Sequence, residues 1–397
     1  MAAFLKHSLL LNFRSQTHIV LQCHLSCQAG LFVCYQRLFC KKANASPPIS
    51  VCSRKSYTGE NKNQVMEKPY LLLNCEKGGI HGIHVKLAAI LEEHFEVIPY
   101  DEFLKNKNFY SHKIKIFYLW TYANAPKHSL LLCLPNLKIV LSPGAGLDHL
   151  DLPLISSYGV KVANTPLTVS SATADFGMAL LLASARSLIE GVKMAALPDI
   201  RYITFNWMGV DITGATLGII GMGKIGYKIA QRAKGFEMKI LYHNRKRRSK
   251  EDENAVGAKY CEKMEDLLQQ SDFVMLVVNL TPETTKLIGK HELKLMKPTA
   301  TLINICRGQV VDQDALVEAL QNGVIRAAAL DVTYPEPLPR DHPLLKLQNV
   351  IVTAHIGART YSTNKKVVER MLANGLAALA GLPIPDEVTQ SQKKSSN

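Results

Sequence analysis

The stretch Thr216-Leu-Gly-Ile-Ile-Gly-Met-Gly-Lys-Ile-Gly-Tyr-Lys-Ile-Ala230 decides the fold of this 397-residue chain. An apolar strand pattern leads into Gly-x-Gly-x-x-Gly, and a helical pattern follows at once. In such a unit the glycines permit a tight turn, let a pyrophosphate approach the backbone, and let helix and strand pack closely. An ordinary glycine turn is the alternative, but the next strand also falls at the distance expected of a dinucleotide fold. The predicted cofactor contacts in this loop are Gly221, Gly223, Lys224, Ile225 and Gly226.

Short apolar runs alternate with helical periodicity from about residue 68 onward, which is typical of helices packed on mainly parallel sheets. A helix is predicted over 171–188, between two series of strands. The first series is predicted at 70–74, 114–119, 138–142 and 160–163, and the second at 216–220, 238–242, 273–278, 300–305, 327–330 and 350–353.

The order of these segments predicts a split domain. A Rossmann-type dinucleotide-binding domain, residues 167–355, would be inserted into a flavodoxin-like α/β substrate domain formed by 68–166 and 356–388. The leader 1–67 and the tail 389–397 would lie outside both domains.

Composition excludes several classes of protein. With 47% apolar and 20% charged residues, the chain suits a folded enzyme, and no run of 18 apolar residues predicts a membrane span. The formal net charge is +14, but residues 1–59 hold seven basic side chains, and the first acidic residue is Glu60. The remaining surplus is ordinary, so we expect neither nucleic acid nor membrane as a partner.

The leader allows several interpretations. It resembles an organelle transit peptide because it lacks acidic residues, but an extension without a role fits equally well. A zinc site is disfavoured because its candidate ligands lack paired short spacings, and polar residues interrupt any secretory signal. Those candidate ligands are Cys23, His24, Cys27, Cys34 and Cys40. The scattered cysteines Cys75, Cys133, Cys261 and Cys306 are predicted to be reduced, buried thiols of an intracellular protein.

The segment His243-Asn-Arg-Lys-Arg-Arg248 follows the second strand of the inserted domain. A site for NADH usually has an acidic residue here, whereas this chain has Asn244 and then four cations. Arginine can hold a 2′-phosphate with charge-assisted hydrogen bonds, so Asn244 and Arg245 predict NADPH as the preferred cofactor, with NADH possible. The alternative is a solvated basic loop.

Three further residues would supply what carbonyl reduction needs. Arg307 ends a buried strand with a cation that needs an anion, and a substrate carboxylate would serve. Glu336 lies between two prolines, and His355 follows the last strand, at the edge of the sheet where ligands bind. Separately, these residues could be a surface ion pair, a loop acid and a core histidine, but their shared location favours a catalytic site.

These motifs together resemble the D-isomer-specific 2-hydroxyacid dehydrogenases, most closely the glyoxylate and hydroxypyruvate reductases, over residues 70–385. The resemblance implies that Arg307, Glu336 and His355 are catalytic and that Ala145 and Gly146 bind the substrate carboxylate. It places Leu280, Thr281, Ile305, Asp331 and Gly357 around the cofactor. Asp175 and Arg359 depart from the family, which more often has Glu and a small residue there.

The chemistry that this implies is hydride transfer to the 2-oxo carbon of a small acid such as glyoxylate or hydroxypyruvate. His355 would donate a proton to the oxygen, and Glu336 would orient the ring and keep it protonated near neutral pH. Arg307 would bind the carboxylate and polarise the carbonyl. A thiolate role for Cys306 is disfavoured because reduction needs no covalent step. The resemblance also implies a homodimer and a cytosolic enzyme, or a matrix enzyme if the leader is a transit peptide.

Two alternatives remain at this stage. One is a sugar-acid reductase of the 2-ketogluconate type. The other is a nucleotide-sensing corepressor of the same fold, which would carry an acidic residue where Asn244 stands. Glu336 argues against a formate dehydrogenase, which has Gln beside the histidine, and the short segment after His355 argues against a long phosphoglycerate dehydrogenase.

Overall fold

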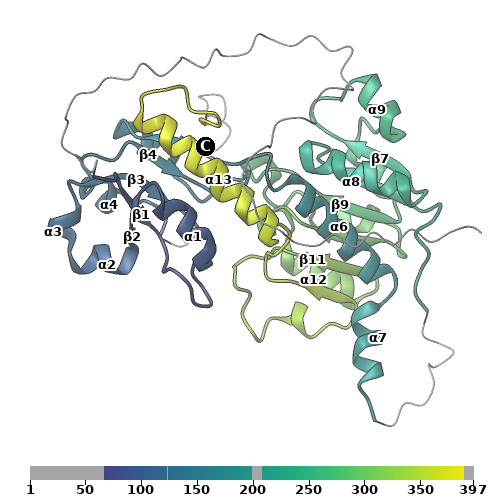
Figure 1. Cartoon of the computed structure of the whole chain (residues 1–397). Coiled ribbons are helices and arrows are strands. Elements are labelled where there is room, and N and C mark those ends of the chain that lie inside the picture. Colours follow the sequence, from purple (N-terminus) through teal and green to yellow (C-terminus); the bar gives the residue numbers. More distant parts are fainter. Residues whose placement is uncertain (1–66, 123, 199–207, 389–397) are drawn as a thin grey trace, which may run out of the picture. The chain divides into compact units, whose positions relative to one another are not determined.

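The computed structural model describes residues 67–122, 124–198 and 208–388. These residues form two parallel sheets, each flanked by helices (Figure 1). The α/β fold class is therefore confirmed. The interpretations of residues 1–59, and the predicted tail, lie outside the described residues.

The first sheet has five strands in the order β2-β1-β3-β4-β5, all parallel, which is the flavodoxin-like order. Its second strand was not predicted, because four residues with only two buried give too short a pattern. The strands are β1 (Tyr70–Leu73), β2 (Glu96–Pro99), β3 (Ile114–Tyr118), β4 (Ile139–Leu141) and β5 (Lys161–Ala163). The helices that belong to this sheet are α1 (Val85–Glu92), α2 (Tyr100–Lys105), α3 (Lys107–Tyr110), α4 (His128–Leu132) and α5 (Leu152–Ser157).

The second sheet has seven parallel strands in the order β12-β11-β10-β9-β6-β7-β8, a Rossmann order extended by one strand. Its strand β8 was not predicted. The strands are β6 (Thr216–Ile220), β7 (Lys239–His243), β8 (Ala258–Tyr260), β9 (Phe273–Leu276), β10 (Thr301–Asn304), β11 (Ala327–Leu330) and β12 (Val350–Val352). The helices are α8 (Lys224–Gly235), α9 (Lys250–Val256), α10 (Met264–Gln270), α11 (Lys290–Leu295) and α12 (Gln313–Gln321), with 3-10 turns at Pro282–Thr284, Gly308–Val310 and Pro343–Leu345.

Two helices replace the one predicted over 171–188. Helix α6 (Ser170–Ala185) packs on the second sheet, and α7 (Leu188–Ala195) begins after Ser187, whose φ of 45° breaks the helical path. Among the described residues no single helix is long and apolar enough to cross a membrane; only the bent pair α6 and α7 passes that test, by length and composition alone.

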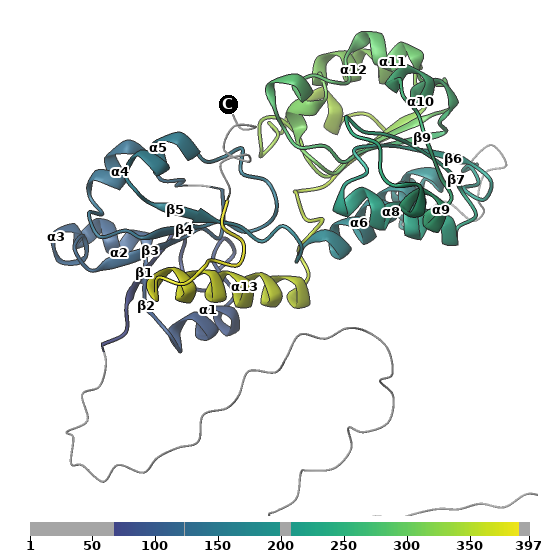
Figure 2. The ribbon, with the colours of Figure 1, turned by 90° about the horizontal axis from the view of Figure 1, so that it is seen from above.

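The last helix, α13 (Tyr361–Leu379), returns the chain to the first sheet. The Thr360 hydroxyl caps its start by accepting from the Thr363 N–H. The helix then packs against α1 and β4 (Figure 2). The chain thus leaves the first sheet before α6 and comes back to it after β12. The limits given for the two domains stay predictions.

The cysteine prediction was half wrong. All four cysteines in the described part of the chain are free, but only Cys261 and Cys306 are buried. Cys75 and Cys133 are half-buried because they lie at the margins of the hydrophobic clusters that cover the first sheet. Cys75 is in the loop after β1, and Cys133 is at the end of α4.

Candidate active site

The glycine-rich turn has the geometry that a dinucleotide requires. Gly221 has a φ of +98°, and a Cβ atom there would lie 2.5 Å from the Val277 carbonyl oxygen. A Cβ on Gly223 would meet no atom within 4 Å, so this side of the turn is open. Helix α8 starts at Lys224 without a side-chain cap, which leaves its first N–H groups for an anion. The turn therefore fits a pyrophosphate.

The residues after β7 have more specific tasks than the sequence suggested. The Asn244 side chain braces the turn, because its oxygen accepts from the Met222 N–H at 2.6 Å. Arg247 forms an ion pair with Glu253. Arg248 pairs with Asp252 and donates to the Met222 carbonyl. Arg245 and Lys246, not named in any of these contacts, are exposed. Within the described residues neither of these two forms a hydrogen bond or an ion pair, although the charge of Arg245 contributes to lowering the pKa of Glu283, after the hydrogen bond from Thr281 and the backbone N–H of Glu283.

A cavity of about 400 Å³ extends from this turn along the carboxyl ends of the strands. It brings together Ile225, Leu280, Thr281 and Ile305, all of which were predicted to contact the cofactor. The Thr281 N–H is already taken by the Thr284 hydroxyl at 2.8 Å, so it is not available to a ligand. The cavity also reaches Arg307.

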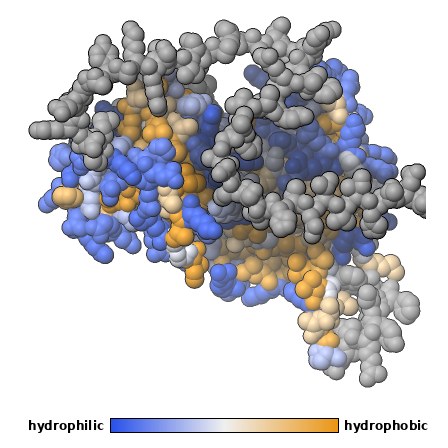
Figure 3. All heavy atoms as spheres, in the orientation of Figure 1, coloured by the Kyte–Doolittle hydropathy of each residue, from blue (hydrophilic) through white to orange (hydrophobic). Residues whose placement is uncertain are grey.

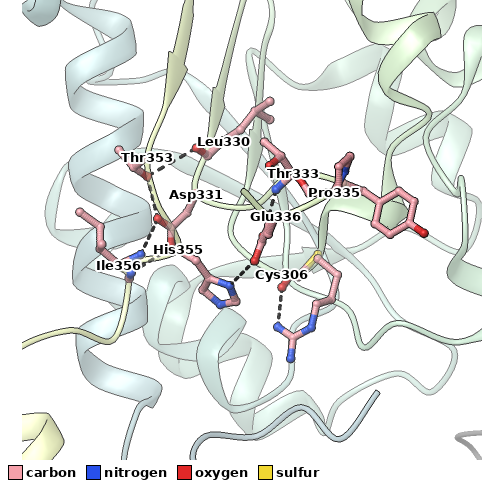
Figure 4. A network of polar contacts seen from close by, with 12 residues as sticks. Cys306, Leu330, Asp331, Thr333, Pro335, Glu336, Thr353, His355 and Ile356 are labelled. Carbon is pink, nitrogen blue, oxygen red and sulfur yellow. Dashed lines mark hydrogen bonds and ion pairs between the residues drawn. The ribbon is translucent and has the colours of Figure 1, made fainter. Parts of the chain in front are cut away.

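His355 and Glu336 form a hydrogen-bonded pair (Figure 4). The Nδ1 atom of the histidine lies 2.9 Å from Oε2 of the glutamate, whose other oxygen accepts from the Thr333 N–H at 3.1 Å. Burial acts to raise the pKa of Glu336, but the His355 contact, the Thr333 N–H and the charge of Arg307 together hold it below its ordinary value. The carboxylate is therefore ionised beside the ring, and Nε2 remains for a substrate.

Asp331 fixes the loop that carries His355. Its carboxylate accepts from the Thr353 hydroxyl at 2.6 Å and from the N–H groups of Ile356 and Gly357 at 2.9 and 2.8 Å, while its backbone carbonyl accepts from the His355 N–H (Figure 4). His355 has a φ of 52°, an uncommon conformation that this network maintains. Asp331 thus positions the histidine, and together with Gly357 it lines a second cavity, of about 330 Å³.

Arg307 already has an anionic partner within the chain, which the sequence did not reveal; its contact with a substrate carboxylate stays a prediction. Its Nε lies 3.0 Å from both oxygens of Asp148, and Nη1 donates to the Cys306 carbonyl at 2.8 Å. The remaining Nη2 lies against Gly146, where a Cβ would approach it to 1.9 Å. Asp148 lies two residues after Gly146, in the segment from Gly144 to Asp148 that we call the substrate loop. Its partner is 159 residues away, so sequence reasoning missed the pair.

The substrate loop offers free donors beside this arginine. The Gly144 N–H is bound to the Thr165 hydroxyl at 2.8 Å, whereas no partner within the described part of the chain is recorded for the N–H groups of Ala145 and Gly146. Both residues line a cavity of about 330 Å³ together with Arg307 and His355. These donors fit a small carboxylate.

The comparisons with known proteins agree with this geometry. The model of the "D-isomer specific 2-hydroxyacid dehydrogenase, NAD binding domain" matches residues 178–357. A glyoxylate reductase from Thermococcus onnurineus is 44% identical over 256 residues, which is 63% of this chain and 75% of the relative. The chain belongs to the D-isomer-specific 2-hydroxyacid dehydrogenase family. A glyoxylate/hydroxypyruvate reductase B from an Enterobacter species is 43% identical over 64% of this chain and 78% of the relative.

Solved structures of dehydrogenases in this family are also similar. An NADPH-dependent glyoxylate/hydroxypyruvate reductase from Sinorhizobium meliloti, in complex with NADP and malonate, superimposes with a TM-score of 0.72 and 26% identity. The match covers 82% of this chain and 98% of that one. The chain is therefore an oxidoreductase of the 2-hydroxyacid dehydrogenase type with a nicotinamide dinucleotide as its cofactor.

Two ring systems beside the site had no predicted role in this dehydrogenase. Tyr122 lies between the rings of His149 and His355, at centroid distances of 4.7 and 5.6 Å. His149 Nε2 contacts the Ser142 hydroxyl at 3.0 Å, and its Nδ1 is buried without a partner in the described residues. Burial raises the pKa of the Cys306 thiol to about 11, so it is no nucleophile at neutral pH.

Proposed function

We propose that this dehydrogenase reduces a small 2-oxo acid, of the glyoxylate or hydroxypyruvate kind, to the D-2-hydroxy acid. The proposal rests on one arrangement: a carboxylate-bound histidine and an anchored arginine line the same small cavity beside the glycine-rich turn. The names of the glyoxylate reductases that it resembles support the same substrate class.

Each residue then has a defined task. Arg307 and the N–H groups of Ala145 and Gly146 hold the substrate carboxylate, and Arg307 polarises the carbonyl. The bound dinucleotide supplies a hydride to the 2-oxo carbon. His355 gives a proton from Nε2 to the carbonyl oxygen, so the carbonyl becomes an alcohol, and Glu336 stabilises the charged ring beforehand. The histidine regains its proton from solvent.

We further propose NADPH as the preferred cofactor. Asn244 stands where a carboxylate would repel a 2′-phosphate, and Arg245 next to it is exposed and without a bonded partner in the described residues. Arg247 and Arg248 are already paired with Glu253 and Asp252. The preference for NADPH over NADH therefore depends mainly on Arg245.

A substrate panel tests the reaction. Glyoxylate, hydroxypyruvate, pyruvate and 2-ketogluconate are each assayed with NADPH and with NADH by the loss of absorbance of the reduced cofactor. We expect the highest kcat/KM with glyoxylate or hydroxypyruvate. A preference for 2-ketogluconate would support the sugar-acid reductase instead, and cofactor binding without reduction of any acid would support a nucleotide-sensing protein.

One variant and a control test the role of Glu336. Glu336→Gln keeps the shape of the side chain but removes its charge, so kcat should fall while the Kd for cofactor stays unchanged. Thr168→Ala is the control: among the described residues, its hydroxyl makes one hydrogen bond, to the Thr165 carbonyl. Wild-type kcat in Glu336→Gln would contradict the role assigned to this carboxylate.

We propose a homodimer formed through α7. Four aliphatic side chains of this region are 41 to 63% exposed, namely Leu188, Ile189, Val192 and Leu197. Figure 3 shows apolar atoms gathered at this end of the molecule. A second copy of the same face would bury them. Val192→Glu should shift the mass measured by light scattering from dimer to monomer, whereas a wild-type monomer would contradict the proposal.

A further inference from the structure

A second arginine lines the cavity of the candidate active site. Arg359 follows His355 by four residues and contributes to the same cavity wall as Arg307. Arg307 is held by Asp148, whereas no ion pair or side-chain hydrogen bond is recorded for Arg359 within the described residues. Exposed arginines are commonly unpaired, but one at the rim of a substrate cavity is placed to meet a ligand.

The surroundings of Tyr122 locate this second cation. Burial raises the pKa of the Tyr122 hydroxyl, and the charges of Arg307 and Arg359 both act to lower it. Tyr122, Arg307 and Arg359 all line the same cavity, and Arg307 lies 5.8 Å from the centre of the Tyr122 ring.

The start of α13 adds donors at the same place. Arg359 immediately precedes Thr360, the cap of this 19-residue helix, so the positive end of the helix dipole lies at this part of the cavity. Asn364, in the first turn, also lines the cavity, and no hydrogen bond of its side-chain amide is recorded in the described part of the chain. A cation, an amide and a helix N-terminus thus adjoin one another.

The carboxylates that line the cavity do not neutralise the positive charge of Arg359. Glu336 is bonded to His355 and to the Thr333 N–H. The carboxylate of Asp331 accepts three hydrogen bonds from the segment around His355. Each acid therefore has its own donors, and a monocarboxylate bound at Arg307 would leave Arg359 without an anion.

We propose that Arg359, Asn364 and the N-terminus of α13 form a second anion subsite, and that between 2-oxo acids of matched carbon skeleton the enzyme prefers the one with a second anionic group, a carboxylate or a phosphate ester, on the side chain. This inference rests on the proposed reduction of 2-oxo acids and extends its substrate class beyond glyoxylate and hydroxypyruvate. A small residue at position 359 would provide no such charge.

Pairs of substrates matched in carbon skeleton test the subsite. The first pair is 2-oxoglutarate and 2-oxovalerate, and the second is 3-phosphohydroxypyruvate and hydroxypyruvate, so the two arms distinguish a carboxylate from a phosphate. The quantity measured is the ratio of kcat/KM within each pair. In Arg359→Ala this ratio should fall about tenfold in at least one pair, the size expected of one charge-assisted hydrogen bond.

Lys105→Ala is the control, since it removes one exposed cation from α2, outside the cavity. It should leave both ratios unchanged. Arg359→Lys should retain part of the preference because the charge remains. Ratios that are equal within twofold in wild type and Arg359→Ala, for both pairs, would overturn the proposal.

A binding measurement separates this inference from the proposed function. If the wild-type enzyme with NADPH bound reduces neither glyoxylate nor any of the four acids, the proposed function fails, and calorimetry then decides the subsite alone. Glutarate should bind this complex about tenfold more tightly than pentanoate, and Arg359→Ala should remove the difference. Equal binding of the two acids to the wild-type complex would refute the second anion subsite.

Discussion

Acidification from pH 7 to pH 5 should destabilise this protein through His149. Burial beside the Tyr122 ring lowers the pKa of His149 to about 4, from an ordinary value of 6.5; Asp148 acts to raise it and Arg307 to lower it further. The unfolded chain therefore binds a proton on this side chain at a pH where the folded chain does not. Because the folded pKa is the lower one, stability decreases as the pH falls from about 7 toward 4.

The magnitude follows from the two pKa values. At pH 5 the unfolded histidine is almost fully protonated and the folded one is mainly neutral, which corresponds to a loss of about 2 kcal/mol relative to pH 7, at about 1.4 kcal/mol for each pH unit. Other groups also titrate in this range, so the quantity of interest is the difference between wild type and His149→Gln. Glutamine keeps a polar atom for Ser142 but does not titrate.

Urea denaturation followed by circular dichroism at pH 7 and pH 5 measures this difference. The free energy of unfolding of wild type should decrease by about 2 kcal/mol more than that of His149→Gln. His81→Gln, at an exposed position, is the matched control and should behave as wild type. If wild type and His149→Gln lose stability equally, within about 0.5 kcal/mol, the histidine is not buried in its neutral form and the reasoning fails.

Three further predictions concern catalysis. Gly146→Ala should leave the melting temperature nearly unchanged but lower kcat/KM about a hundredfold, because the new Cβ displaces the flexible end of Arg307; unchanged kinetics would show that Arg307 does not bind substrate at this place. His355→Ala should reduce turnover by at least about a hundredfold, and added imidazole should restore part of it; full activity without imidazole would exclude this proton donor. Wild type should prefer NADPH at least about tenfold in kcat/KM, and Asn244→Asp combined with Arg245→Ala should erase the preference; equal values for both cofactors in wild type would leave a solvated basic loop as the better explanation.

Local signals made much of the fold predictable. The turn at Gly221 depends on residues within one strand and one helix, and the pattern there identified β6 and α8 correctly. Strand β2 was missed because Glu96–Pro99 has only two buried residues, too few to show a period. The end of α6 was missed because the conformation of Ser187 is imposed by its surroundings and not by its own preference.

The candidate site likewise contains residues that could be predicted from the sequence and contacts that could not. Glu336 and His355 could be found because each stands at a recognisable position of a strand or loop, and the structure brings them within 2.9 Å. The partner of Arg307 could not be found, because Asp148 lies in a different sheet region and only folding brings the two together. The bond from the Met222 N–H to the Asn244 side chain was likewise hidden, since the sequence does not show that this side chain also supports the turn.

The bond between Arg307 and Asp148 reduces the entropy that the protein loses when a very small ligand binds. A free arginine side chain loses up to about 2 kcal/mol of conformational entropy when a ligand immobilises it. Here the bond to Asp148 already restrains the side chain before any ligand arrives. A molecule as small as glyoxylate has few atoms with which to offset such a loss, and even very efficient small ligands gain at most about 1.5 kcal/mol per heavy atom. Because the guanidinium group of Arg307 is already restrained, nearly all of this limited attraction contributes to the affinity for the ligand and to its orientation.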